Sequence, residues 1–198
     1  MYKTVQHSLF SEREAKDLIK AWLAISFVFA VLMTGFSLSL RFYYAIIFSS
    51  LTVGIAFIAH ELSHRTVARN YGCFAEFRSF DSMLVLAIIM SFFGFVFIAP
   101  GAVVISGPVG KGRNGKISMA GPLANLILAA IFLLVQLIFG FSFSYGSYKN
   151  LPLTINSWLA LFNLIPVWNF DGKKILAWNR FVYGIMVAVA FAIMFLSY

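Results

Sequence analysis

Long apolar stretches separated by short polar segments make up most of the chain. An α-helix rises 1.5 Å per residue, so about 20 apolar residues are needed to cross a hydrocarbon core roughly 30 Å thick. Five stretches have about this length, and they are Ala21–Leu40, Phe42–Ala59, Ile117–Phe139, Pro152–Phe170 and Phe181–Tyr198. The pattern therefore predicts an all-α integral membrane protein with about five transmembrane helices.

A sixth apolar stretch, Met83–Ile105, is long enough to cross the membrane but is interrupted by Pro100-Gly101. Proline removes a helical hydrogen bond and glycine adds conformational freedom, so a continuous helix is not expected here. The flanking runs Phe95–Ile98 and Ala102–Ile105 are rich in residues that favour strands. We expect a re-entrant hairpin around residues 83–106, formed as a helix, as a β-hairpin of these two runs, or as a mixture of both.

The distribution of Lys and Arg indicates the orientation, because cytoplasmic loops carry an excess of both. If the sixth stretch enters and leaves on one side, 13 of the 15 basic residues face the cytoplasm, and only Arg41 and Lys149 face the other side. A single crossing would instead place the basic groups of Lys111–Lys116 and Lys173–Arg180 on opposite sides. The charges therefore favour a multi-pass protein of the cytoplasmic (plasma) membrane with five spans and a re-entrant hairpin.

The composition agrees with a location in the lipid bilayer. Apolar residues make up 61% of the chain and charged residues 11%, against roughly 45–50% and 25% in soluble domains. The net charge of +8 comes from short basic clusters between apolar stretches, which is typical of topology signals and not of a nucleic-acid-binding surface. We therefore expect no nucleic-acid partner. The single cysteine, Cys73, excludes an intramolecular disulfide framework and a multi-cysteine metal cage.

The chain is expected to form one membrane-embedded domain over residues 1–198, because neither a repeat nor a second polar domain is evident. Residues 1–20 contain acidic as well as basic side chains, which is unlike a signal peptide, and are interpreted as a cytoplasmic arm. Ser11 followed by Glu14 matches a capping box. This pattern predicts that a helix begins there and continues into the first span.

The second span ends in the sequence His60-Glu61-Leu62-Ser63-His64. Residues four apart on a helix lie on one face, so the two imidazoles can bind one zinc ion, with Glu61 placed to act on a bound water. Ionisable side chains within a membrane helix cost about 2.5–3.5 kcal/mol each, and a divalent cation would compensate for them. The alternative is that the span ends at Ala59 and that these residues only lie in the interface.

Asp171, which follows the fourth span, is the candidate third ligand. Pro166 is expected to break the helix before it, and Gly172 to permit a turn directly after it. The alternative is a surface carboxylate that pairs with Lys173 or Lys174.

The topology and the metal site support each other. In the five-span arrangement, the second and fourth spans both end on the cytoplasmic side. His60, His64 and Asp171 would then lie at similar depth and could bind one Zn²⁺ per chain, with the site toward the cytoplasm. The basic residues favour this arrangement without reference to the metal.

Three motifs in this order resemble the site-2 protease family of intramembrane zinc metalloproteases. They are His60–His64, the sequence Ala-Gly-Pro-Leu-Ala-Asn at 120–125, and Asn163–Pro166 followed by Asp171-Gly172. The resemblance covers residues 42–180, which would form the catalytic core, and implies zinc ligation by His60, His64 and Asp171, with Glu61 as the catalytic carboxylate. It also implies hydrolysis of peptide bonds in or near transmembrane helices of membrane-protein substrates.

The chain departs from larger members of that family in two respects. It contains no PDZ or CBS domain, and one span follows Asp171-Gly172, so the helices that gate substrate in larger members are expected to be reduced. The segment Phe95–Ile105 is also similar to the re-entrant segment of prokaryotic members.

Two further groups of residues are candidates for substrate contacts. Asn125 and Asn163 are amides in apolar runs, and they would either donate to the developing oxyanion or form hydrogen bonds between helices. The other group would bind an unwound substrate by strand addition or, alternatively, serve as a packing plug. It comprises Ala102, Val103, Val104 and Ile105.

Two other function classes compete with a protease. A proteolytically inactive relative that binds membrane helices is disfavoured, because Glu61 and all three candidate ligands are present. A small membrane transporter would be expected to have an internal repeat and ionisable residues on more than two spans. The sequence has neither feature.

Overall fold

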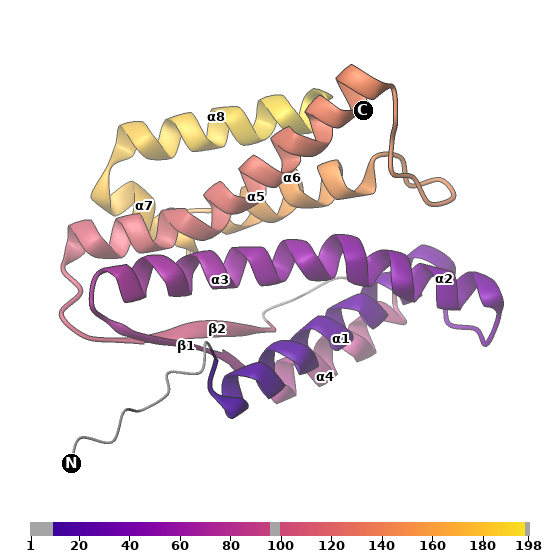
Figure 1. Cartoon of the computed structure of the whole chain (residues 1–198), viewed down its shortest axis with the longest axis horizontal. Coiled ribbons are helices and arrows are strands. Elements are labelled where there is room, and N and C mark those ends of the chain that lie inside the picture. Colours follow the sequence, from indigo (N-terminus) through magenta and orange to yellow (C-terminus); the bar gives the residue numbers. More distant parts are fainter. Residues whose placement is uncertain (1–9, 96–99, 197–198) are drawn as a thin grey trace, which may run out of the picture.

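The computed structural model describes residues 10–95 and 100–196, and these residues are mostly helical. The first half contains α1 (Glu12–Thr34), α2 (Leu40–Ser49), the π-helical turn η1 (Ser50–Gly54), α3 (Ile55–Asn70), β1 (Phe74–Ser79) and α4 (Asp81–Ser91). The second half contains β2 (Gly101–Ser106), α5 (Lys111–Phe139), α6 (Leu151–Asn163), α7 (Asp171–Trp178) and α8 (Arg180–Leu196). In Figure 1, α3 crosses the middle of the molecule, with α5 and α8 above it and the sheet, α1 and α4 below it.

Three helical segments are long and apolar enough to cross a membrane, namely Glu12–Thr34, Leu40–Asn70 and Lys111–Phe139. The segment Leu40–Asn70 comprises α2, η1 and α3 in one continuous run. The helix does not end at Ala59, so His60, Glu61 and His64 lie within it. The expectation of an apolar, mostly helical membrane protein agrees with these three candidate spans.

The fourth expected span is shorter in the structure than the sequence pattern predicts. Helix α6 has 13 residues and ends at Asn163, because Pro166 cannot continue it. The stretch Pro152–Phe170 is therefore a helix followed by an irregular turn. Helix α8 has 17 residues, is apolar and covers the described part of the expected span Phe181–Tyr198, whose residues 197–198 lie outside the described residues.

Strands β1 and β2 form an antiparallel pair in which Phe77 lies opposite Val103. The sequence pattern predicts a different partner for Ala102–Ile105, namely the run Phe95–Ile98. One edge of β2 is thus taken by β1, which the sequence pattern does not predict. The predicted pairing with Phe95–Ile98 stays a prediction, because residues 96–99 lie outside the described residues. Phe77 is fully buried and meets the ring of Phe57 on α3 edge-on at 5.7 Å between centroids, which fixes the sheet against α3.

The start of α1 agrees with the capping pattern only in part. The Ser11 hydroxyl accepts a hydrogen bond from the Glu14 backbone N–H at 3.1 Å, so the predicted helix start is confirmed. The Glu14 side chain does not complete the capping box but instead pairs with Arg65 and with the Phe77 backbone. A carboxylate expected at a helix end is therefore buried between three elements.

Candidate metal centre

Helix α3 brings the two histidines of the metal motif together. His60 and His64 are both buried, with 5% and 8% of their surface exposed. Their Nε2 atoms are 3.0 Å apart. Both side chains lie one helical turn apart on the same face, as their spacing predicts.

Asp171 completes the cluster from the start of α7. Its Oδ2 atom lies 3.0 Å from His64 Nε2 and 3.5 Å from His60 Nε2. Its Oδ1 atom lies 3.7 Å from Lys174 Nζ, so the carboxylate faces the imidazoles and a lysine at the same time. The predicted convergence is observed, whereas the alternative of a surface carboxylate does not describe Asp171, which is 8% exposed.

Gly172 allows α7 to approach the end of α6. A Cβ atom at this position would lie 2.0 Å from the carbonyl oxygen of Leu164, a separation that no side chain tolerates. The sequence pattern predicts a turn at this glycine. The structure assigns it to the close approach of two backbones, which places Asp171 beside α3.

Helix α5 orients both imidazoles through their Nδ1 atoms. His60 Nδ1 donates to Asn125 Oδ1 at 2.6 Å, and His64 Nδ1 donates to the Ile117 carbonyl at 2.7 Å. Both acceptors are oxygens, so in each ring the Nδ1 atom carries the proton. Each Nε2 atom therefore presents a lone pair to the other imidazole and to Asp171, which is the tautomer that metal-binding histidines adopt.

This arrangement fits a zinc ion. Two Nε2 lone pairs and one carboxylate oxygen converge and would repel one another unless a cation compensated for them. The three ligand atoms lie within 4.8 Å of one another, and tetrahedral ligands at the usual zinc distances of about 2.0–2.1 Å are roughly 3.3–3.4 Å apart. The observed separations of 3.0–3.5 Å bracket that value.

Gly121 leaves the space that the ligand atoms occupy. A Cβ atom built on it would lie 2.2 Å from His64 Nε2 and 2.6 Å from His60 Nε2. Any side chain at this position of α5 would therefore displace the imidazoles. In the sequence, Gly121 is visible only as part of the motif at 120–125. A glycine between Ala120 and Pro122 inside a helix is the signal that could have indicated this close packing.

The cluster lies at the wall of a cavity of about 480 Å³. Most of the lining is apolar, and the polar side chains in it include Glu61, Asn163 and Lys174. Strand β2 contributes Gly101, Ala102, Val103 and Ile105. The cavity therefore presents a mostly apolar surface beside Glu61.

The structure separates the two candidate amides. Asn125 is fully buried, and its Nδ2 donates to the Ala56 carbonyl at 3.1 Å and to Asn156 Oδ1 at 3.0 Å. Asn163 lines the cavity and donates to the Leu159 carbonyl at 2.9 Å. The contacts of Asn125 match the predicted alternative of hydrogen bonds between helices, whereas Asn163 lies at the wall of the cavity.

The backbone of β2 contacts the proposed catalytic carboxylate. The Val103 N–H donates a hydrogen bond to Glu61. On the other strand, the Phe77 N–H points away from β2 toward Glu14. Both observations follow from antiparallel pairing, because a pair that does not exchange hydrogen bonds, here Phe77 and Val103, directs its backbone groups outward.

Two kinds of comparison with known proteins give no match. No protein-family model matches the chain, and no solved structure matches it.

Curated proteins, in contrast, include clear relatives. The chain is 43% identical over 179 residues to "Putative zinc metalloprotease MJ0611" of Methanocaldococcus jannaschii, covering 89% of this chain and 90% of that one. It is 31% identical over 157 residues to "Zinc metalloprotease MJ0392" of the same organism, covering 78% of this chain and 40% of the relative. "Putative zinc metalloprotease YwhC" of Bacillus subtilis is 29% identical over 147 residues, covering 64% and 66% of the two chains.

The alignment with the first of these relatives covers nearly the whole of both chains, at 43% identity. Its name agrees with the chemistry of the buried cluster of His60, His64 and Asp171. This chain belongs to the zinc metalloprotease family that these relatives represent.

Proposed function

We propose that the chain is an intramembrane zinc metalloprotease of the site-2 type, which hydrolyses peptide bonds in or near the transmembrane helices of membrane-protein substrates. One observation carries the proposal: His60, Glu61 and His64 lie on Leu40–Asn70, a helix long and apolar enough to cross a membrane. The helix that would span the bilayer is thus also the helix that would hold the metal. Substrates that reach this site are themselves expected to be embedded in lipid.

His60, His64 and Asp171 would hold one Zn²⁺ per chain. The ion, when bound, supplies a Lewis acid that lowers the pKa of a bound water and polarises the scissile carbonyl. Glu61 takes a proton from the attacking water and returns it to the nitrogen of the leaving amine. The hydrogen bond from the Val103 N–H orients the Glu61 carboxylate for this transfer.

Asn163 is the better candidate of the two amides for stabilising the oxyanion. Its side chain faces the cavity, and only one of its two N–H groups is needed for the hydrogen bond to Leu159. The other can donate to an oxygen that becomes negative during the attack. Asn125 acts instead through His60, whose ring it orients.

The sheet supports a way of holding an unwound substrate. The outer edge of β1 is occupied by side chains, since Glu14 accepts from the Phe77 N–H and Arg69 Nε donates to the Ala75 carbonyl. Strand β2 faces the cavity on its other side. A substrate segment would add to this edge of β2 as a further strand.

The alternation of an antiparallel pair divides the four predicted strand residues into two kinds. Val103 and Ile105 direct their backbone groups to the cavity edge. Ala102 and Val104 pair with Arg78 and Glu76 of β1. Val103 and Ile105 are therefore the residues that would bind the substrate backbone.

The proposed topology has five crossings and a re-entrant segment in the cytoplasmic membrane. The three long apolar helices supply three crossings, and the shorter α6 and α8 supply the other two. The excess of Lys and Arg in the segments that flank the site supports a metal centre toward the cytoplasmic side.

The test is cleavage of a defined reporter by purified, zinc-loaded protein in lipid vesicles. Two single-span reporters are compared, one with an all-leucine helix and one with Gly and Pro in the middle of that helix. We expect cleavage within the Gly–Pro helix, and a loss of about 10²-fold or more in the Glu61→Gln variant, since general base catalysis contributes about that much. Equal cleavage by Glu61→Gln, or cleavage only of soluble unfolded protein, would contradict the proposal.

A further inference from the structure

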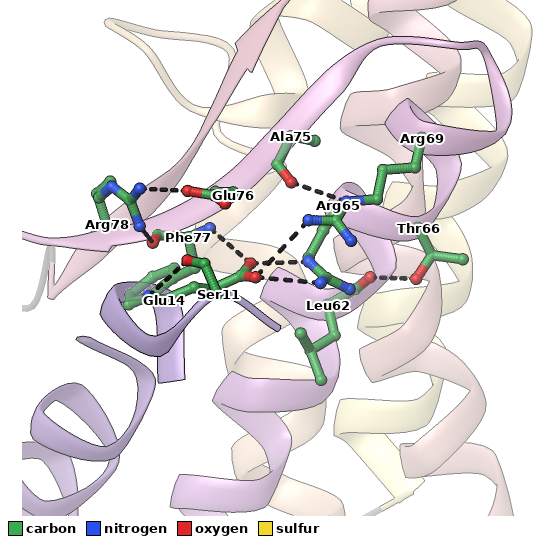
Figure 2. A network of polar contacts seen from close by, with 10 residues as sticks. All are labelled: Ser11, Glu14, Leu62, Arg65, Thr66, Arg69, Ala75, Glu76, Phe77 and Arg78. Atoms are coloured by element: carbon green, nitrogen blue, oxygen red, sulfur yellow. Dashed lines mark hydrogen bonds and ion pairs between the residues drawn. The ribbon is translucent and has the colours of Figure 1, made fainter. Parts of the chain in front are cut away.

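A buried carboxylate outside the metal centre joins three elements of the fold. Glu14, in the first turn of α1, has 0% of its surface exposed. Its Oε1 atom lies 2.7 Å from Arg65 Nε and accepts a hydrogen bond from the Phe77 N–H at 3.0 Å. Its Oε2 atom accepts from Arg65 Nη2 at 3.0 Å. Figure 2 shows the Glu14 carboxylate between the arginines of α3 and the backbone of β1.

The arginine of this pair belongs to the catalytic helix. Arg65 directly follows His64, is 6% exposed and stacks its guanidinium 4.4 Å from the centre of the Phe10 ring. Arg69, one turn later on α3, lies 3.7 Å from Glu14 and donates to the Ala75 carbonyl. The end of α3 that follows the metal motif is therefore fastened to α1 and to β1 by charged groups.

The same contacts lead to Glu61 through the sheet. Phe77 lies opposite Val103 in the antiparallel pair, and the Val103 N–H donates a hydrogen bond to the Glu61 carboxylate. One end of this chain of contacts is thus the carboxylate of Glu14, and the other end is the catalytic carboxylate. The sheet lies between the two carboxylates: Glu14 bonds the outer edge of β1, and Glu61 bonds the outer edge of β2.

Stability alone does not explain such a pair. Taking both charges out of water costs about as much as their attraction returns, and apolar residues of similar volume often serve equally well. A charged and hydrogen-bonded pair adds specificity of position, which apolar packing lacks. Glu14 bonds one particular N–H of β1, that of Phe77, and one particular side chain of α3, that of Arg65. A slip of β1 by one residue would take the Phe77 N–H away from the buried Glu14 carboxylate, because the neighbouring residues of β1 direct their N–H groups toward β2.

We infer that Glu14 is a positioning residue for catalysis: its carboxylate holds β1 and the catalytic helix α3 in one register, so that the cavity edge of β2 meets Glu61. The inference rests on the proposed function, because this edge of β2 is where the substrate would pair. Glu14 itself lies outside the cavity lining and touches no reacting atom.

Three variants test this role. Glu14→Gln keeps the shape of the side chain and removes its charge. The double variant Glu14→Leu with Arg65→Met replaces the ion pair by apolar groups of similar size. It restores the packing but not the specific hydrogen bonds to the Phe77 N–H and between the two side chains. The matched control is Glu12→Gln, which removes a carboxylate two residues earlier that is 85% exposed and pairs only with Lys16 among the described residues.

Zinc content, thermal stability and kcat on the Gly–Pro reporter are measured for each variant. We expect Glu12→Gln to match the parent, and Glu14→Gln to lose stability. The double variant should regain the parent's melting temperature and zinc content while its kcat stays at least tenfold low, since misplacement by about 1 Å can cost about 10²-fold in rate. Recovery of kcat together with stability would overturn the inference, because the role would then be structural. Failure of both Glu14 variants to fold would overturn it in the same way.

Hydrogen–deuterium exchange gives a readout that does not need a substrate. In the zinc-loaded double variant, amides of residues 74–79 and 101–106 should exchange at least tenfold faster than in the parent, because the Phe77 N–H has lost its acceptor and the sheet its register. Unchanged exchange in both strands would contradict the inference even if the reporter is not cleaved by any variant. Absence of cleavage by the parent, with altered exchange in the variant, would refute the proposed function alone.

Discussion

The Oδ1 atom of Asn125 lies 2.6 Å from Nδ1 of His60, and this contact sets the tautomer of a candidate zinc ligand from a different helix. Asn125 can hold this position because its Nδ2 is bonded to the Ala56 carbonyl and to Asn156. Helix α5 therefore contributes to the metal centre without offering a ligand of its own.

The first prediction concerns this contact. Asn125→Ala should weaken zinc binding by about 10- to 100-fold, as is typical when the hydrogen-bond partner of a metal-binding histidine is lost. Asn163→Ala is the comparison, since it should keep the zinc affinity of the parent and lower only turnover. Zinc competition with a chromogenic chelator measures both. Equal zinc affinity in the Asn125→Ala variant and the parent would refute the role assigned to Asn125.

A second prediction concerns the space in front of the imidazoles. Gly121→Ala should abolish stoichiometric zinc binding, because its Cβ would lie 2.2 Å from His64 Nε2. Gly112→Ala on the same helix is the control, since the nearest atom outside its own helix is 4.0 Å away. Metal analysis of both purified variants distinguishes the cases, and full zinc occupancy in Gly121→Ala would show that the cluster is not the zinc site.

A third prediction concerns the cavity edge of β2. Ile105→Pro removes a backbone N–H that points outward from the β1–β2 pair, so the sheet should persist while an added substrate strand loses a hydrogen bond. We expect a rise of at least about tenfold in KM on the Gly–Pro reporter, which corresponds to about 1.4 kcal/mol, with zinc content unchanged. Ile105→Val keeps the N–H and should behave as the parent. Parent-like KM in a folded proline variant would favour the packing plug.

The fourth prediction concerns the anchoring of the sheet. Phe77 is fully buried against Phe57, and Phe77→Ala should lower the free energy of unfolding by about 3–5 kcal/mol. Phe74→Ala, on the same strand at a position 57% exposed, should cost much less. Denaturant unfolding in detergent measures the difference, and similar losses in both variants would contradict the packing described for β1.

The convergence of His60, His64 and Asp171 could be predicted from two patterns that are visible in the sequence itself. Helical spacing puts both histidines on one face of the helix. The distribution of Lys and Arg indicates that the second and fourth apolar stretches end on the same side of the membrane. The groups that orient the ligands could not be predicted, because the Ile117 carbonyl and the Asn125 side chain act across 53 and 65 residues of sequence.

The partner of β2 was missed for a related reason. Residues 74–79 contain Glu76 and Arg78, so their pattern resembles a polar loop and not a buried strand. The burial of Phe77 depends on packing against Phe57, and that of Glu14 depends on Arg65 at a distance of 51 residues in sequence. Contacts of this range leave no periodic signal in the sequence.

Zinc stoichiometry tests the central claim most directly, because every proposed step depends on one metal ion held by His60, His64 and Asp171. The measurement is zinc per chain in detergent-purified parent protein and in the Asp171→Ala variant. The account predicts about one zinc ion in the parent and a clear loss in the variant. A parent protein that binds no zinc after reloading, or a variant that retains it fully, would contradict the account.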